Sequence, residues 1–172
     1  MKKWLKKFIK KELSIKEAEK LGVKIGKNCR FLNVTSSTFG SEPYLINIGN
    51  HVTITRGVSF ITHDGGVWVF RNEEKNIDVF GKIKVGNNVF IGLNSLILPG
   101  VTIGDNVVIA AGSIVTKNIE SNSVVGGNPA RKIRAIEEYR EKSWENADFI
   151  KNYSNIEKKK YLINKFNQSE VK

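Results

Sequence analysis

The stretch Val79–Glu120 reads, in successive sixes, VFGKIK, VGNNVF, IGLNSL, ILPGVT, IGDNVV, IAAGSI and VTKNIE. The first place of every six is a β-branched aliphatic residue: Val79, Val85, Ile91, Ile97, Ile103, Ile109 and Val115. After the first six, the fourth place is always Gly or Asn: Asn88, Asn94, Gly100, Asn106, Gly112 and Asn118. This spacing is too sparse for an amphipathic helix, whose apolar positions recur every three or four residues.

Each six predicts a short strand followed by a sharp corner. A β-branched residue suits a strand with one side chain fixed in the core, and Gly and Asn adopt a positive φ at low cost. Strands stacked in this way bury their Val and Ile side chains against one another in a column, which predicts a β solenoid. The alternative is a chance run of Val, Ile and Gly in an ordinary sheet, which seven sixes in phase disfavour.

This pattern resembles the hexapeptide repeat of the left-handed parallel β-helix acyltransferases. The resemblance covers roughly residues 23–134, with earlier repeats at 23–28 and from Ile48 onward. It implies a triangular coil of three sixes and a homotrimer with C3 symmetry and an active site between adjacent chains. The left hand comes from the resemblance alone, because crossovers between parallel strands are nearly always right-handed.

The repeats also set the expected domain organisation. Residues 1–22 are expected to form N-terminal helices, with Ser14 and Glu17 as a capping box. Residues 23–134 form the β-helix domain, and the non-repetitive segment 64–78 is an insertion that leaves the coils and rejoins them at Val79. Residues 135–172 form a charged helical tail. The fold class is therefore an all-β solenoid with α-helices at both ends.

The composition limits the classes of function. The chain has 172 residues, a net charge of +11 and one cysteine, Cys29, which excludes a disulfide framework and favours the cytoplasm. Nucleic acid is not an expected partner, because the repeats carry no face of interleaved basic and aromatic residues. A phosphorylated ligand suits the charge better.

The N-terminal segment 2–13, KKWLKKFIKKEL, predicts a basic amphipathic helix. One interpretation is that its apolar stripe packs on a neighbouring element or subunit. The other is peripheral contact with an anionic membrane at its inner face, which would suit a lipid-linked acceptor.

The two histidines, His51 and His63, both occupy the corner position of a six. His51 is interpreted as a turn residue. His63 is the last residue before the insertion, where the acyltransferase family has its catalytic histidine, and its titration near neutrality suits a general base. Asp64 is the candidate carboxylate that orients the ring, although neighbours in sequence often point apart. No metal is expected. A γ-type carbonic anhydrase shares the solenoid but needs three zinc histidines, and this chain has only two histidines, at unsuitable spacing.

The runs IAAGSIVTKNI and GGNPARKIR resemble the acetyl-coenzyme A site of sugar O-acetyltransferases in this family. The resemblance implies that Gly92 and Leu93 line the thioester end and offer a backbone N–H to the oxyanion. It implies that Ala111 meets the pantetheine arm and that Thr116 and Lys117 lie by the pyrophosphate. Phosphate contacts are implied for Arg131 and Arg134. The alternative for Lys117, Arg131 and Arg134 is ordinary surface charge.

Two residues of the insertion are candidates for the acceptor. Trp68 would stack on a sugar ring or, equally, anchor the loop on a neighbouring subunit, and Arg71 would meet an anionic sugar or phosphate.

We therefore expect an acetyl-CoA-dependent O-acetyltransferase of a sugar or lipid-linked sugar in cell-surface polysaccharide synthesis. The alternatives are an amino-sugar N-acetyltransferase and a non-catalytic scaffold. A fused nucleotidyltransferase is excluded, because 22 residues before the repeats cannot hold its domain.

Overall fold

The computed structural model describes residues 12–169, with side chains as far as Asn167, and divides into two units, Met1–Tyr139 and Arg140–Lys172. The amphipathic helix predicted over 2–13 lies outside the described residues, except for Glu12 and Leu13.

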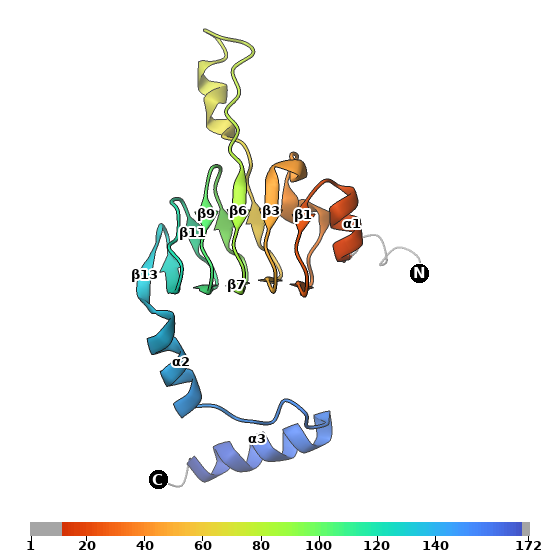
Figure 1. The fold of residues 1–172 in the computed structure, drawn as a ribbon, viewed down its shortest axis with the longest axis vertical. Coiled ribbons are helices and arrows are strands. Elements are labelled where there is room, and N and C mark those ends of the chain that lie inside the picture. The colour runs from red at the N-terminus through yellow and green to blue at the C-terminus, as the bar shows by residue number, and fades with distance from the viewer. Residues whose placement is uncertain (1–11, 170–172) are drawn as a thin grey trace, which may run out of the picture. The chain divides into compact units, whose positions relative to one another are not determined.

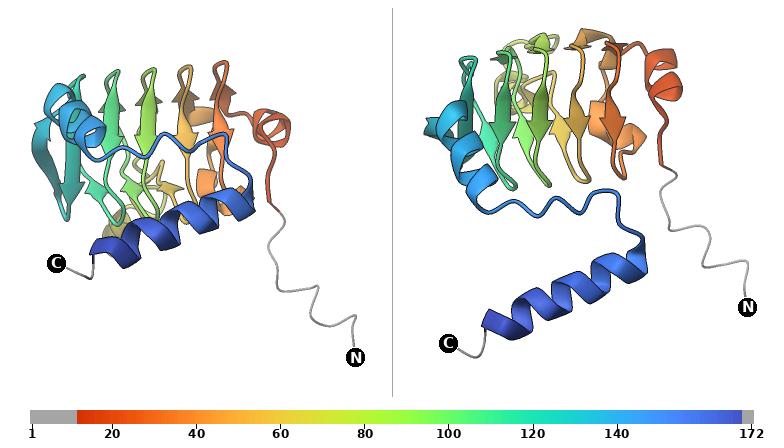
Figure 2. Two further views of the ribbon diagram at one scale, coloured as in Figure 1. Left: turned by 90° about the horizontal axis from the view of Figure 1, so that it is seen from below. Right: turned by 60° about the horizontal axis from the view of Figure 1, so that its bottom comes forward.

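The first unit contains three sheets, which the chain visits in rotation (Figures 1 and 2). Sheet A contains β1 (Lys24–Ile25), β3 (Ile46–Ile48), β6 (Ile83–Val85) and β9 (Thr102–Ile103). Sheet B contains β2 (Arg30–Phe31), β4 (Thr53–Ile54), β7 (Val89–Ile91), β10 (Val107–Ile109), β12 (Ser123–Gly127) and β13 (Ala130–Ala135). Sheet C contains β5 (Ser59–Phe60), β8 (Leu96–Ile97) and β11 (Ile114–Val115). All these strands pair in parallel, except that β12 and β13 form an antiparallel hairpin.

The register gives the length of each coil. Asn87 bonds to Asp105, its equivalent one coil later and 18 residues along the chain, which equals three sixes. Across the insertion, the equivalent pair Asn50 and Asn87 is 37 residues apart. The excess over a regular coil is 19 residues (37 minus 18), four more than the 15 of the predicted insertion 64–78, and the parallel register on either side is undisturbed.

The predicted column of β-branched residues forms the core. Val85, Ile91, Ile97, Ile103, Ile109 and Val115 are all buried. The prediction is wrong for Val79, which is 47% exposed. Its carbonyl accepts a hydrogen bond from the Asp64 amide, so Val79 belongs to the base of the insertion, and the chain rejoins sheet A at β6.

Most of the predicted corners have the expected conformation. Asn88, Asn94, Gly100, Asn106 and Gly112 have positive φ values. Asn118 does not belong to this set, because the last coil is shorter. Its side chain accepts a hydrogen bond from the amide of Thr102, only 16 residues earlier, so two residues of the regular corner are missing.

The insertion forms an arm with a closed base (Figure 1). His63 and Phe80 form an antiparallel bridge, and the Gly81 amide donates to the Thr62 carbonyl. Beyond this base, a 3₁₀ helix, η4 (Gly65–Phe70), begins the arm. The arm therefore starts and ends at adjacent points on the corner between sheets C and A.

The helices lie toward the two ends of the described chain, as expected. Helix α1 (Ile15–Lys20) has the predicted capping box of Ser14 and Glu17. Helix α2 (Ile136–Glu145) follows β13, and α3 (Asn155–Ser169) belongs to the second unit. Within residues 12–169, no helix combines the length and apolar character needed to cross a bilayer.

The irregular segment 31–44 is more ordered than its sequence indicated. It contains two 3₁₀ helices, η2 (Ser36–Phe39) and η3 (Pro43–Leu45). Phe39 is fully buried and stacks on Phe60, with ring centroids 5.8 Å apart. This segment completes the first coil on the side where later coils have strands of sheet C.

Candidate active site

The base of the arm holds a histidine and a carboxylate in contact. His63 Nδ1 lies 3.0 Å from Glu42 Oε2, and the Thr62 hydroxyl donates to the same oxygen at 2.6 Å. The Glu42 side chain is 14% exposed, whereas that of His63 is 41% exposed. With its Nδ1–H donated to Glu42, the imidazole has a lone pair on Nε2 available to accept a proton.

The hydrogen bonds to Glu42 keep it ionised. The Thr62 hydroxyl and then the His63 ring lower the pKa of the Glu42 carboxyl below its ordinary value of 4.5, and these effects outweigh the opposing effect of burial. A carboxylate held in its charged form stabilises the imidazolium that forms when the ring accepts a proton. The pair thus has the electrostatics of a general base and its orienting anion.

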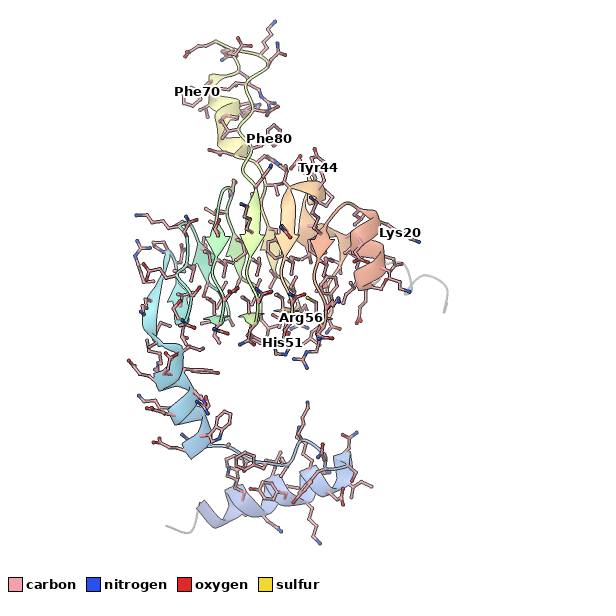
Figure 3. All side chains as sticks on the ribbon, viewed as in Figure 1. Lys20, Tyr44, His51, Arg56, Phe70 and Phe80 are labelled. Carbon is pink, nitrogen blue, oxygen red and sulfur yellow. The ribbon has the colours of Figure 1, made fainter. Side chains whose placement is uncertain are left out.

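Three phenylalanines lie around this pair. Phe39 lies three residues before Glu42, and Phe60 lies three residues before His63, so their stacked rings tie the two segments together. Phe80 lies across the bridge from His63, and the two rings are tilted by 63° with their centroids 6.2 Å apart. Figure 3 shows Phe80 at the base of the arm and Phe70 farther out.

Asp64 does not contact the His63 ring. Its side chain instead accepts a hydrogen bond from the Gly66 amide at 2.9 Å and caps η4. The residue that sequence reasoning missed is Glu42, since 21 positions separate it from His63. The only available signal was an acid in the irregular segment just before the repeats resume.

His51 is a corner residue, as expected. It has a φ of 55°, and its Nδ1 lies 2.9 Å from Asn88 Oδ1. The Asn88 side-chain amide donates a hydrogen bond to Asn106 Oδ1, and the Asn106 side-chain amide donates one to Asn122 Oδ1. His51, which is labelled in Figure 3, thus heads a ladder of side chains along the corner between sheets A and B.

The expected cofactor residues fall on two different corners. Gly92, Leu93 and Ala111 lie between sheets B and C, where the Gly112 amide donates to the Leu93 carbonyl. Thr116 and Lys117 lie between sheets C and A, on the same corner as His63. The strands of sheet C lie between these two corners, so Leu93 and His63 are on opposite edges of that sheet. Within one chain, Leu93 and His63 are therefore not brought together.

The two expected oxyanion donors differ. The Gly92 amide donates to the Ile109 carbonyl at 2.9 Å as part of sheet B. No hydrogen bond occupies the Leu93 amide in the part of the chain that the structure describes. Leu93 therefore has the available N–H, while Gly92 allows the close approach of coils, because a Cβ there would lie 2.5 Å from the Ala111 nitrogen.

A cavity of about 370 Å³ lies at the C-terminal end of the coils. Its lining includes Lys117, Arg131 and Lys132, together with the side of β12. These cations suit the phosphates of a nucleotide-containing donor. Arg134 is half-buried outside this lining and lies opposite Val124 in the hairpin.

The arm presents an apolar surface. Trp68, Val69, Phe70 and Phe80 are each more than half exposed. Arg71 forms an ion pair with Asp78 at 2.7 Å, so its charge is already matched within the arm. Trp68 remains available to a sugar or a neighbouring subunit, whereas an anionic sugar would have to compete with Asp78 for Arg71.

Comparison with known proteins agrees with this architecture. A family model described as the hexapeptide repeat of succinyl-transferase matches residues 82–117. Protein CapG of Staphylococcus aureus is 60% identical over 98% of both chains. Galactoside O-acetyltransferase of Escherichia coli is 46% identical to this chain, and the matched region covers 55% of this chain and 46% of that enzyme. A maltose O-acetyltransferase structure from Clostridium difficile has a TM-score of 0.51 at 30% identity, covering 76% of this chain and 82% of its own.

The chain belongs to the hexapeptide-repeat acetyltransferase family. It is therefore an acyltransferase.

Proposed function

We propose that this protein transfers an acetyl group from acetyl-CoA to a sugar hydroxyl during synthesis of a cell-surface polysaccharide. The observation that carries the proposal is the His63–Glu42 pair at the base of an exposed, aromatic arm. The sugar acceptor is supported by the galactoside and maltose acetyltransferases among the similar proteins. The polysaccharide context is part of the proposal.

In this mechanism, His63 Nε2 removes the proton from the acceptor hydroxyl while Glu42 stabilises the resulting imidazolium. The hydroxyl oxygen attacks the thioester carbonyl directly, and the Leu93 amide is the proposed donor to the oxyanion. The C–S bond then breaks, and the proton held by His63 passes to the departing thiolate. Asp64 shapes the start of the arm and takes no proton.

The proposed assembly is a homotrimer of left-handed β-helices with the active site between adjacent chains. His63 and Leu93 lie on opposite edges of sheet C, so a site that uses both requires two copies. The outward residues of sheet C include Leu96 and Ile114, which are half-buried and apolar, whereas Thr102 and Lys84 face outward from sheet A. Sheet C is therefore the better interface.

The cofactor would lie along this interface. Ala111 would contact its pantetheine arm, and Thr116, Lys117 and Arg131 would contact its phosphates, with the cavity at the end of the coils receiving that charge. Arg134 is the weaker candidate, because it lies outside the cavity lining.

The function is tested by measuring CoA release from acetyl-CoA with a panel of neutral, amino, nucleotide-linked and lipid-linked sugars. Acceptor-dependent release with an ester product supports O-acetylation. An amide product would identify an N-acetyltransferase instead. Absence of CoA binding would favour a scaffold.

Replacing Glu42 by glutamine is expected to lower kcat about tenfold and to leave CoA affinity unchanged. The amide lacks the charge that stabilises the His63 imidazolium. Because the folded-state pKa of Glu42 is lowered, its contribution to stability is complete above its unfolded-state pKa and is lost as pH falls through the folded value.

The thermal stability of this variant should therefore fall below that of the wild type at pH 7, and the gap should close as the pH drops below 4.5. Glu42→Asp, which keeps the charge, should restore part of kcat. A constant gap in Tm at all pH values would contradict the role of the ionised carboxylate.

Replacing Ile114 by glutamate is expected to dissociate the trimer, since burying an unpaired carboxylate in an interface costs several kcal/mol, of order 2–5. Thr102→Glu is the matched control, because it adds the same charge to an outward position of sheet A. Light scattering after size-exclusion chromatography measures the mass of each. An intact trimer in the Ile114 variant would exclude sheet C from the interface.

A further inference from the structure

A second concave surface lies on the outer side of sheet A, apart from the cofactor cavity. This groove has a volume of about 160 Å³ and is lined by Lys24, Lys82 and Lys84, with Tyr44–Asn47 and Ile83 between them. No acidic residue lines it. None of the three lysines forms an ion pair within residues 12–169.

The sheet register places the three lysines around one point. Lys24 pairs with Asn47, and Asn47 pairs with Lys84, so the two lysines flank Asn47 on adjacent strands. Strands lie about 4.8 Å apart, and alternate residues in a strand lie about 7 Å apart. Lys82 and Lys84 therefore project from the same face of β6 and its approach, with Lys24 roughly 10 Å across the sheet from Lys84.

Such a group of ammonium ions suits a ligand with several negative charges. Lysine binds phosphate as a compact point charge, and a concave surface of one sign concentrates ions of the other. The three lysines project from two strands about 10 Å apart, and a diphosphate offers them negative charge at two adjacent centres, whereas a carboxylate offers it at one.

Two residues that line the groove lie close in sequence to the candidate catalytic pair. Tyr44 follows Glu42 by two residues, and Lys82 follows Phe80, the bridge partner of His63, by two residues. Figure 3 places Tyr44 on the same edge of the coils as Phe80. An anionic group in the groove would thus lie beside a sugar whose hydroxyl reaches His63 Nε2.

We propose that the groove of Lys24, Lys82 and Lys84 binds the diphosphate of a diphosphate-linked sugar and so selects the acceptor. This proposal rests on the proposed acetyltransferase function and specifies its substrate class. The diphosphate would link the sugar to a nucleoside or to a polyprenyl lipid, and the groove would recognise the diphosphate in either case. The charge-matched Arg71 of the arm has no part in it.

The binding test uses the full chain and inorganic pyrophosphate, titrated by calorimetry in the presence of saturating CoA so that the cofactor cavity is filled. The double variant Lys82→Gln/Lys84→Gln should bind pyrophosphate at least about tenfold more weakly than the wild type. The control Lys16→Gln/Lys27→Gln removes the same charge outside the groove and should bind normally. Equal affinity in the two double variants, or no binding by the wild type, overturns the proposal.

The kinetic test compares one sugar in three forms: free, linked to a nucleoside diphosphate, and linked to a polyprenyl diphosphate in vesicles. The groove variant should raise KM about tenfold for the preferred diphosphate form, with kcat retained and the free sugar unaffected. The diphosphate form with the lower KM in the wild type identifies whether the natural acceptor carries a nucleoside or a polyprenyl lipid. An equal loss on all three forms overturns the proposal.

The failure of either proposal can be recognised separately. A His63→Ala protein should still bind pyrophosphate in the groove, whether or not it retains turnover. Intact pyrophosphate binding by a protein that transfers no acetyl group to any acceptor would contradict the proposed function alone. Normal acetyl transfer by a protein that binds no pyrophosphate would contradict the proposed role of the groove alone.

Discussion

Replacing His63 by alanine is expected to lower kcat for acetyl transfer by about 10³-fold, within the range found when a general base is removed. The acceptor hydroxyl would then attack without losing its proton to Nε2, and Glu42 would face no imidazolium. CoA affinity should remain within about twofold of the wild type, because His63 lies outside the cavity that contains Lys117 and Arg131.

His51→Asn provides the matched control, since it removes the other histidine and places at that corner the residue found at Asn88 and Asn106. This variant should retain full activity. The rate of CoA release with saturating acceptor measures both. Equal turnover by wild type and His63→Ala would remove His63 from the mechanism and leave the Glu42 contact with a structural role only.

Replacing Gly49 by alanine is expected to destabilise the folded protein by about 3 kcal/mol. A Cβ at this position would lie 2.5 Å from the carbonyl oxygen of Gly86 in the next coil, and 2.9 Å from Asn87 Oδ1. The obstacle is backbone that is itself held in sheet A, so neither side moves without loss of parallel hydrogen bonds. The Tm should fall by roughly 6–12 °C.

Gly65→Ala is the control for this substitution. Nothing lies within 4 Å of a Cβ at Gly65, and the residue has no positive φ. Its Tm should match that of the wild type in the same thermal scan. If the two alanine variants had the same Tm, the close approach of Gly49 and Gly86 would not limit how the coils stack.

The sequence predicted the stacking of the coils because each coil repeats the same local requirement. A buried β-branched residue and a corner residue with positive φ recur every six positions, and both leave a direct mark on residue choice. The prediction was wrong where that requirement stops. Val79 has the right residue type but lies in the antiparallel base of the arm, where pairing with Asp64 replaces burial.

The candidate site was harder to predict, because its parts meet across distance rather than along the chain. His63 was predicted from its place at the start of an insertion, and its catalytic role stays a prediction. Glu42 was missed because only the packing of Phe39 on Phe60 brings its carboxylate to the ring. The lysine groove was missed for the same reason, since Lys24 and Lys84 become neighbours only when β1 and β6 flank β3.

The closed base of the arm separates two kinds of evolutionary change. Because Asp64 and Gly81 already bond to their partners at the point of departure, the coils above and below keep their register whatever the arm contains. Mutation can lengthen, shorten or replace residues 65–78 while the core of the coils stays intact. Descendants of such a protein can diversify the sugars they modify while inheriting one unchanged acetylation chemistry.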